Sequence, residues 1–306
     1  MNASVHALLE GILDYAGLFP PAKLDMPSAA SEYDHHRRGP LRWMLSRFLC
    51  PLARLEELRR HLHEPWPLGV LAAPADDPEA LSASLDRELG LLGGLSAQVL
   101  EVPFPRGLLG SGNVGAFLGR TSDRLARDPA APKVVFFELG FAGGWPETLR
   151  RVAGHLADHH GRGSPVRFGM KVRTGGADAA AVPDADRVAG FILTARDAGV
   201  PFKATAGLHR AVRGNGMHGF LNVFSAGVFM KYRKIQTEDL RDLLREDDPA
   251  AFRFDDEGLA WRAVHATVDQ IRRARLAFAV SFGSCSFTEP WEHLHALGLL
   301  EQGPGA

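Results

Sequence analysis

The chain has 306 residues, and its 35 lysines and arginines against 36 aspartates and glutamates give a formal net charge of −1. This balance argues against nucleic acid as the main ligand, because binding to a phosphate backbone needs a net basic surface or a dense basic patch. Hydrophobic residues make up 45% of the chain, which is typical of a globular protein. Two cysteines are too few for a disulfide framework.

The first 40 residues predict a short helix followed by a proline-rich extension that wraps around a larger unit. Val5, Leu8 and Ile12 share one face of that helix. The segment carries acidic residues and lacks the basic start and long apolar stretch of a signal peptide. No apolar run approaches the roughly 20 residues that cross a bilayer. We therefore expect a cytoplasmic protein with no membrane contact.

From residue 41 onward, short apolar segments alternate with segments whose apolar residues recur at helical spacing. A further strand is predicted at 275–287, and an eighth, with a weaker pattern, near 251–255. Residues 218–232 fit either a buried helix or a strand. The six clearest predicted strands are 43–50, 68–73, 97–103, 133–140, 166–173 and 201–207.

Strands that alternate with helices in this way form right-handed parallel units. The strand count and the length favour one barrel, typically of about 250 residues, over a doubly wound sheet. We therefore predict an α/β fold with a single (β/α)8 TIM-like barrel over residues 41–306. Residues 1–40 would be an N-terminal extension, and an insertion would precede the seventh predicted strand.

Charged side chains interrupt two neighbouring predicted strands. Lys171 and Arg173 lie two residues apart on the fifth, and Lys203 and Thr205 lie two apart on the sixth, so each pair shares one face. A charge inside an apolar strand is costly unless it is paired or functional. In these barrels the site lies at the carboxyl ends of the strands.

One interpretation is purely structural, with Glu101 and Glu138 neutralising the two lysines as ion pairs. The other is catalytic. A lysine amine attacks a carbonyl carbon only when it is neutral, and a neighbouring cation with partial burial lowers its pKa toward that state. Lys203 would then be the nucleophile. Lys171 and Arg173 would lower its pKa.

Two short runs resemble the deoxyribose-phosphate aldolases, which are Schiff-base (class I) aldolases on this barrel. Residues 203–207, Lys-Ala-Thr-Ala-Gly, are similar to the Lys-Thr-Ser-Thr-Gly run around that family's imine-forming lysine on strand six. Residues 282–286, Phe-Gly-Ser-Cys-Ser, resemble its phosphate-binding Phe-Gly-Ala-Ser-Ser run. The resemblance implies that Lys203 forms the imine and that Ser284 and Ser286 contact a phosphate.

The family also has a second lysine ahead of a Gly-Gly pair on strand seven, after the imine-forming lysine. In this chain the lysine ahead of Gly175 and Gly176 is Lys171, which precedes Lys203 and falls on the fifth predicted strand. The order of the two lysines therefore departs from the family when the predicted strands are counted.

Histidines and cysteines supply further candidates. His209 follows the sixth predicted strand and suits acid–base work. His209 and His218 fit no standard metal-ligand spacing, so no metal is expected. No glycine-rich nucleotide-binding motif occurs, so no cofactor is expected. Cys285 and Cys50 are expected to be buried thiols.

The sequence thus predicts a Schiff-base-forming lyase, or aldolase, for a small phosphorylated or carboxylated carbonyl compound. The alternatives are an enolising isomerase or lyase without a covalent step, and a non-catalytic barrel that binds an anion. The expected partner is a small anionic metabolite, and a homo-oligomer stays open. The predicted catalytic residues are Lys203, Lys171, Glu138 and His209, and the predicted substrate contacts are Arg173, Thr205, Gly175, Gly176, Ser284 and Ser286.

Overall fold

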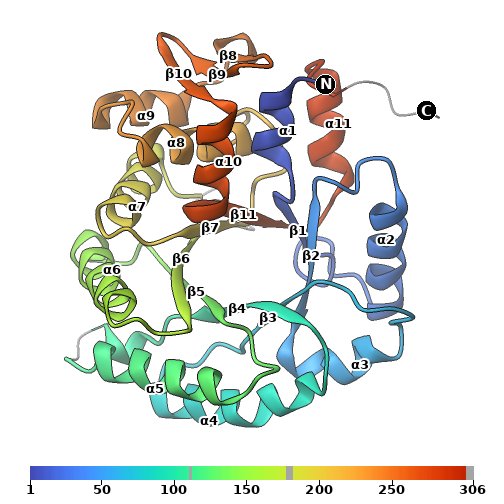
Figure 1. The fold of residues 1–306 in the computed structure, drawn as a ribbon, viewed down its shortest axis with the longest axis vertical. Helices are drawn as coiled ribbons and strands as arrows, with labels where there is room; N and C mark the ends of the chain where they lie inside the picture. The colour runs from blue at the N-terminus through green and yellow to red at the C-terminus, as the bar shows by residue number, and fades with distance from the viewer. Residues whose placement is uncertain (110–111, 177–181, 301–306) are drawn as a thin grey trace.

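A computed structural model describes residues 1–109, 112–176 and 182–300. Eight parallel strands close into a barrel in the order β1-β11-β7-β6-β5-β4-β3-β2, and helices surround it (Figure 1). This confirms the predicted TIM-like barrel. The barrel strands are β1 (Leu13–Tyr15), β2 (Leu45–Pro51), β3 (Leu68–Leu71), β4 (Ala97–Pro103), β5 (Val134–Leu139), β6 (Arg167–Arg173), β7 (Phe202–Thr205) and β11 (Ala279–Ser284).

The helices begin where the sequence supplies capping groups. Asp25 and Asp184 accept a hydrogen bond from the third residue of α2 and α7, and Thr267 with Gln270 forms a capping box on α10. The described helices are α1 (Ala3–Leu9), α2 (Met26–Arg38), α3 (Leu55–Arg59), α4 (Pro78–Leu89), α5 (Val114–Arg127), α6 (Trp145–Gly161), α7 (Ala185–Asp197), α8 (Phe220–Lys231), α9 (Thr237–Arg245), α10 (Val268–Ala277) and α11 (Thr288–Ala296).

The expected insertion lies between β7 and β11. It contains α8, α9 and a three-stranded antiparallel sheet formed by β8 (Phe252–Phe254), β9 (Gly258–Trp261) and β10 (Val264–Thr267). The ambiguous segment 218–232 is helix α8, whose residues are buried from Phe220 to Met230 because it packs against α7, α9 and α10. Burial on all sides explains why its sequence has no polar face.

The eighth barrel strand was expected near 251–255, and this expectation is wrong. That segment forms β8 of the small antiparallel sheet, and the barrel is instead completed by β1, inside the segment 1–40 that was expected to be an extension. β1 pairs with β11 through Leu13 and Phe282 and with β2 through Leu13 and Leu45. Its three residues, Leu-Asp-Tyr, are too few and too polar to show an apolar strand pattern.

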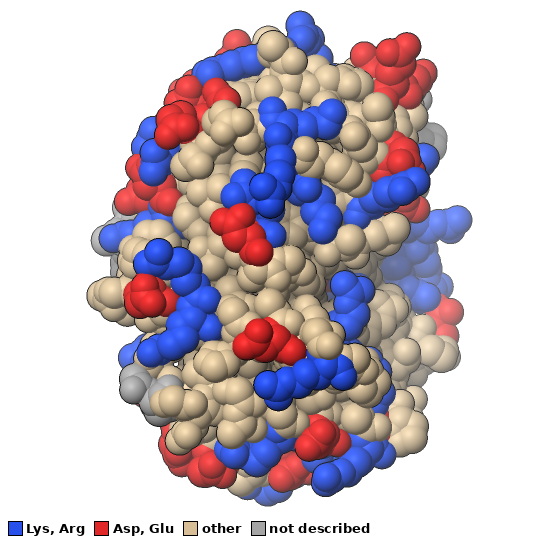
Figure 2. Space-filling view, turned by 60° about the vertical axis from the view of Figure 1, so that its left-hand side comes forward, with Lys and Arg blue, Asp and Glu red and all other residues tan. Residues whose placement is uncertain are grey.

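Adding β1 shifts the count of every later strand by one. β6, which carries Lys171, is the sixth barrel strand, and β7, which carries Lys203, is the seventh. The expectation that Lys203 lies on strand six is therefore wrong. No helix in the described part of the chain is long and apolar enough to cross a membrane. Figure 2 shows basic and acidic side chains interspersed over the face that it presents.

Candidate active site

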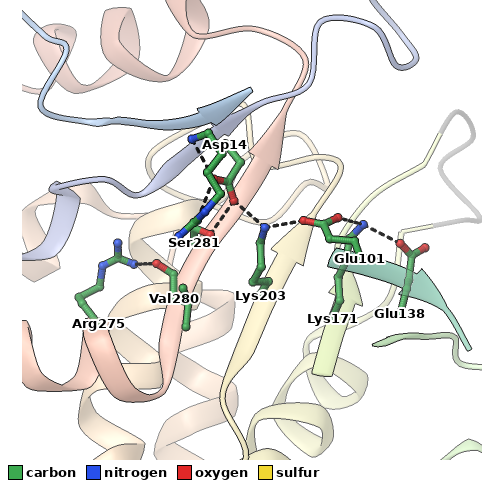
Figure 3. A network of polar contacts seen from close by, with 9 residues as sticks. Asp14, Glu101, Glu138, Lys171, Lys203, Arg275, Val280 and Ser281 are labelled. Carbon is green, nitrogen blue, oxygen red and sulfur yellow. Dashed lines mark hydrogen bonds and ion pairs between the residues drawn. The ribbon is translucent and has the colours of Figure 1, made fainter. Parts of the chain in front are cut away.

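Two lysines on adjacent strands share one carboxylate in the barrel interior (Figure 3). Lys171 on β6 is paired in register with Lys203 on β7. Lys171 Nζ donates to Glu101 Oε2 at 2.5 Å, and Lys203 Nζ donates to Glu101 Oε1. Glu101 comes from β4, so its side chain reaches the lysines from another part of the wall. The predicted pairing of the lysines with Glu101 is confirmed.

Beyond Lys203 the network continues to β1, the strand that the sequence pattern did not predict. Lys203 Nζ lies 2.6 Å from Asp14 Oδ2 on β1. Ser281 Oγ donates to the same Asp14 oxygen at 2.7 Å, and Arg47 Nη1 donates to Asp14 Oδ1 at 3.1 Å. Asp14 is a residue of the barrel wall, inside the segment 1–40 that was expected to be an extension.

Beyond Lys171 the network reaches the solvent. Lys171 Nζ lies 2.9 Å from Glu138 Oε2, and Arg173 donates to Glu138 Oε1 from Nε at 3.1 Å and from Nη2 at 3.0 Å. The exposed fraction of the side chain rises along this direction, from 0% at Lys203 to 5% at Lys171, 21% at Glu138 and 52% at Arg173. A small molecule entering beside Arg173 would therefore meet Glu138 and Lys171 before Lys203.

Each carboxylate in the network is held ionised. Burial acts to raise the pKa of Glu101, but the charges of Lys171 and Lys203 outweigh it and the pKa lies below its ordinary value. The pKa of Asp14 is lowered for the same reason, with Lys203 and Arg47 outweighing burial. Four cations and three carboxylates are linked by these contacts, so the network carries a charge of +1 when all of them are ionised.

The pKa of Lys171 is shifted in the direction opposite to the one expected for a cationic cluster. Burial acts to lower it, but Glu101 and Glu138 more than compensate, so the pKa is raised. Lys171 and Arg173 were expected to lower the pKa of Lys203 as neighbouring cations, and the structure pairs each of them with a carboxylate. Arg173 bonds Glu138, and Glu101 lies between the two lysines.

The loops that follow β6 and β7 contact each other directly. Thr174 Oγ1 donates to the carbonyl oxygen of Ala206 at 2.6 Å, and Thr174 N donates to that of Thr205 at 2.9 Å. A Cβ added at Gly207, where φ is +76°, would lie 2.8 Å from Gly175 Cα. Two glycines are therefore needed for this approach. Gly176, the other predicted contact in this loop, is exposed.

The two predicted phosphate-binding serines lie at the end of β11, where their hydroxyl groups shape a turn. Ser284 Oγ donates to the Ser286 carbonyl oxygen at 2.7 Å, and Ser286 Oγ accepts from Glu289 N at 3.2 Å. Ser286 also lines a pocket of about 550 Å³, whose charged or titratable lining groups are Glu32, His35, His36 and Cys285. No lysine or arginine among the described residues lines this pocket, so they do not supply there the cation that usually accompanies a bound phosphate.

His209 does not contact the lysine network in the described part of the chain. Its Nδ1 lies 2.7 Å from Glu289 Oε2 instead. His218 is buried, with Nε2 2.7 Å from the carbonyl oxygen of Pro183. Among the described residues, no group of three or more histidine, cysteine, aspartate or glutamate side chains is arranged to hold a metal ion. The structure therefore does not bring His209 together with the other predicted catalytic residues.

Sequence reasoning missed Arg47 and Ser281 as partners of Asp14. Arg47 could have been found by the argument used for the lysines, because it is a charge inside a predicted apolar strand. Ser281 gave no such signal. Of the two cysteines, Cys50 is buried as expected, but Cys285 is only partly buried.

Comparisons with known proteins do not place the chain in a family. No protein-family model matches the chain, and no curated protein matches it. The fold is a (β/α)8 barrel.

Proposed function

We propose that the protein is a Schiff-base-forming lyase of the aldolase type that acts on a small phosphorylated or carboxylated carbonyl compound. The observation that carries this proposal is the pair of buried lysines on β6 and β7 that share the Glu101 carboxylate. A barrel core can be filled by apolar side chains, and burying paired charges gives it little stability. Such groups gather where their chemistry is used.

Two observations favour Lys171 over Lys203 as the nucleophile. Counted with β1, Lys171 lies on strand six, the strand that carries the imine-forming lysine in the resembling aldolases, although the Lys-Ala-Thr-Ala-Gly run lies at Lys203 on strand seven. Lys171 also lies nearer the solvent, whereas Lys203 is fully buried between Asp14 and Glu101. Lys203 would then hold Glu101 in place and keep it ionised.

The proposed imine forms without a net gain or loss of protons. The Lys171 ammonium passes one proton to Glu138, and the neutral amine forms a carbon–nitrogen bond to the substrate carbonyl carbon. The nitrogen then passes one of its protons to the former carbonyl oxygen, and protonated Glu138 supplies the second proton as that oxygen leaves as water. Ammonium and carbonyl thus give a protonated imine and one water.

The protonated imine then accepts the electron pair of the neighbouring carbon–carbon bond as that bond breaks, which leaves an enamine on Lys171. A hydroxyl group on the departing carbon loses its proton to Glu138, and that fragment leaves as an aldehyde. Glu138 protonates the enamine carbon, and one water hydrolyses the imine to the second product and the free lysine. Glu138 suits the proton transfers because it contacts Lys171 and is partly exposed.

The anionic part of the substrate would meet Arg173, which is the most exposed cation of the network. Arg173 spends two donors on Glu138 and its guanidinium has others available. Thr205, Gly175 and Gly176 would line the approach. We propose Ser284 and Ser286 as more distant substrate contacts, and this part of the proposal rests only on the resemblance to the aldolases.

The test is borohydride trapping, which reduces an imine to a stable amine. The protein is incubated with small aldehydes, keto acids and sugar phosphates and is then reduced with borohydride. The mass of the intact protein shows whether an adduct has formed, and peptide mapping shows which lysine carries it. We expect an adduct on Lys171 that is absent from Lys171→Met and retained by Lys234→Met, a matched change at an exposed lysine. An adduct on Lys203 would support the same lyase reaction, with the roles of Lys171 and Lys203 exchanged.

A second candidate function is the enolising isomerase or lyase without a covalent step. The raised pKa of Lys171 favours it, because a lysine that stays protonated can polarise a carbonyl while a carboxylate removes the neighbouring proton. Turnover that is lost in Lys171→Met, with no adduct trapped in the unaltered protein, would replace the first proposal with this one. Binding of an anion with no turnover would leave the non-catalytic barrel.

A further inference from the structure

A cavity of about 500 Å³ lies at the amino-terminal end of the barrel, opposite the end at which Arg173 meets the solvent. Its walls come from residues near the starts of β2, β4, β5, β6 and β11 and from the ends of α1 and α10. This end of such barrels usually contributes to stability alone. A cavity here is therefore a feature that the proposed lyase does not use.

Four arginines line this cavity, and one carboxylate, Glu10, accompanies them. The lining arginines are Arg47, Arg167, Arg272 and Arg275, so the lining carries a charge of +3 when Glu10 is ionised. Guanidinium groups suit phosphate and carboxylate groups, and they are charged at neutral pH even at Arg275, where burial lowers the pKa to about 9.

The arginine charges are largely left without carboxylate partners. Arg167 and Arg272 make no ion pair in the described part of the chain, and both are exposed. Arg275 is fixed by hydrogen bonds that it donates to the backbone carbonyls of Leu8, Glu10, Ala279 and Val280, which hold the guanidinium in place without neutralising it. Figure 3 shows the bond to Val280.

Arg47 differs from the other three because Asp14 is its partner. Its Nη1 donates to Asp14, while its buried Nε has no hydrogen-bond partner among the described residues. Phe136 also lines the cavity, and the Lys203 ammonium lies 5.6 Å from the centre of its ring. Arg47 and Phe136 therefore belong both to the cavity and to the surroundings of the lysine network.

Apart from the polar residue Gln98, the remaining walls are apolar. Val99, Val134 and Pro201 line the cavity, together with Leu276, whose side chain is 80% exposed. An inorganic ion would leave this surface in contact with water. A molecule with an anionic group and an apolar body would cover both parts of the lining.

We propose that this cavity is a second binding site, for a small organic anion that places a phosphate or carboxylate group on the arginines and an apolar body against Val99, Val134 and Leu276. The site is separate from the one at the carboxyl ends of the strands. It stands whether or not an imine forms on Lys171.

The test is titration calorimetry with phenyl phosphate as the probe and with inorganic phosphate and phenol as comparison ligands. We expect phenyl phosphate to bind more tightly than either comparison ligand. Arg272→Ala and Arg167→Ala should each weaken it by about three- to fivefold, which is the usual effect of one exposed charge pair. Neither side chain forms an ion pair within residues 1–109, 112–176 and 182–300, so no such pair is lost in either variant.

Two variants serve as controls for position and for charge. Arg273→Ala removes the same charge from the neighbouring residue of α10, which does not line the cavity, and Arg173→Ala removes a cation at the opposite end of the barrel. Arg273→Ala should leave the affinity within about twofold, since an exposed charge that does not line the cavity is screened. Arg173→Ala should remove only binding at the carboxyl ends of the strands, where Arg173 is proposed to meet the substrate anion, and should leave binding in the cavity unchanged.

Three results would overturn the proposal. These are no binding of phenyl phosphate to the unaltered protein, equal weakening by Arg272→Ala and Arg273→Ala, and loss of binding in Arg173→Ala with none in Arg272→Ala. Equal affinity for phenyl phosphate and inorganic phosphate would overturn the apolar half of the proposal. Calorimetry needs no turnover, so a failure here is distinct from a failure to trap an imine.

Discussion

Lys171 and Lys203 face each other across β6 and β7 at one register position, and the Glu101 carboxylate accepts a hydrogen bond from both. Two ammonium groups that both contact one carboxylate lie close together, and without that carboxylate they would repel each other strongly in the barrel interior. Glu101 is therefore the group on which the arrangement of both lysines depends.

Glu101→Gln should destabilise the protein by about 3–5 kcal/mol, the usual cost of removing one partner of a buried ion pair. Urea denaturation measures the free energy of unfolding. Glu147→Gln, which removes an exposed carboxylate paired with Arg150, should stay within about 0.5 kcal/mol of the unaltered protein. A loss below about 1 kcal/mol for Glu101→Gln would contradict the bridging role.

Stability should fall at alkaline pH through Lys171. Its pKa is raised in the folded protein, so the stability that it contributes is fully present below about 10.4, the value of an unfolded-chain lysine, and is lost as the pH rises through the folded value. Thermal unfolding from neutral to strongly alkaline pH shows this loss. In Lys171→Met the loss of thermal stability between neutral and strongly alkaline pH should be smaller than in the unaltered protein. In Lys234→Met this loss should be unchanged.

On the acid side the sign is reversed. The pKa of Glu101 and that of Asp14 are lowered in the folded protein, so their contribution is present above about 4.3 and is lost as the pH falls through the folded values. Acid unfolding followed by circular dichroism checks this. Asp14→Asn should be less stable at neutral pH and should lose less additional stability on acidification, and an unchanged acid curve would argue against the Asp14 pairing.

Gly207→Ala tests the contact between the loops after β6 and β7. The new Cβ would meet Gly175 Cα at 2.8 Å, and the positive φ of +76° adds a backbone cost of about 1–2 kcal/mol. Gly199→Ala is the matched control, since Gly199 has φ +65° and open space around its Cβ position. Gly207→Ala should lose more stability than Gly199→Ala by about 1 kcal/mol or more, and equal losses would show that the loops separate freely.

The two thiols should differ in reactivity. Cys50 is fully buried, and burial raises the pKa of its thiol to about 12, whereas Cys285 is partly buried and its pKa is raised less far. A disulfide reagent at mildly alkaline pH should modify Cys285 slowly and Cys50 only after unfolding. Cys285→Ser should abolish the native-state reaction. Rapid modification of Cys50 in the folded protein would contradict its burial.

The lysines and their carboxylates could be predicted from the sequence because a charge inside an apolar parallel strand stands out. The same argument fails for β1, whose three residues around Asp14 show neither alternation nor an apolar run. Missing that strand moved Lys203 to the wrong position in the barrel. His209 was misplaced for another reason, because the path of a loop after a strand depends on tertiary contacts such as Glu289 that no local pattern reveals.

Barrel closure places β11 between β1 and β7, so a chain emerging from the ribosome presents two unpaired edges until residues 279–284 have been made. Open edges invite pairing with other chains. One of these edges carries Asp14 and the other Lys203, and inward-pointing charges on an edge strand discourage such pairing. We therefore expect the charges of Asp14 and Lys203 to reduce aggregation of the incomplete barrel during synthesis.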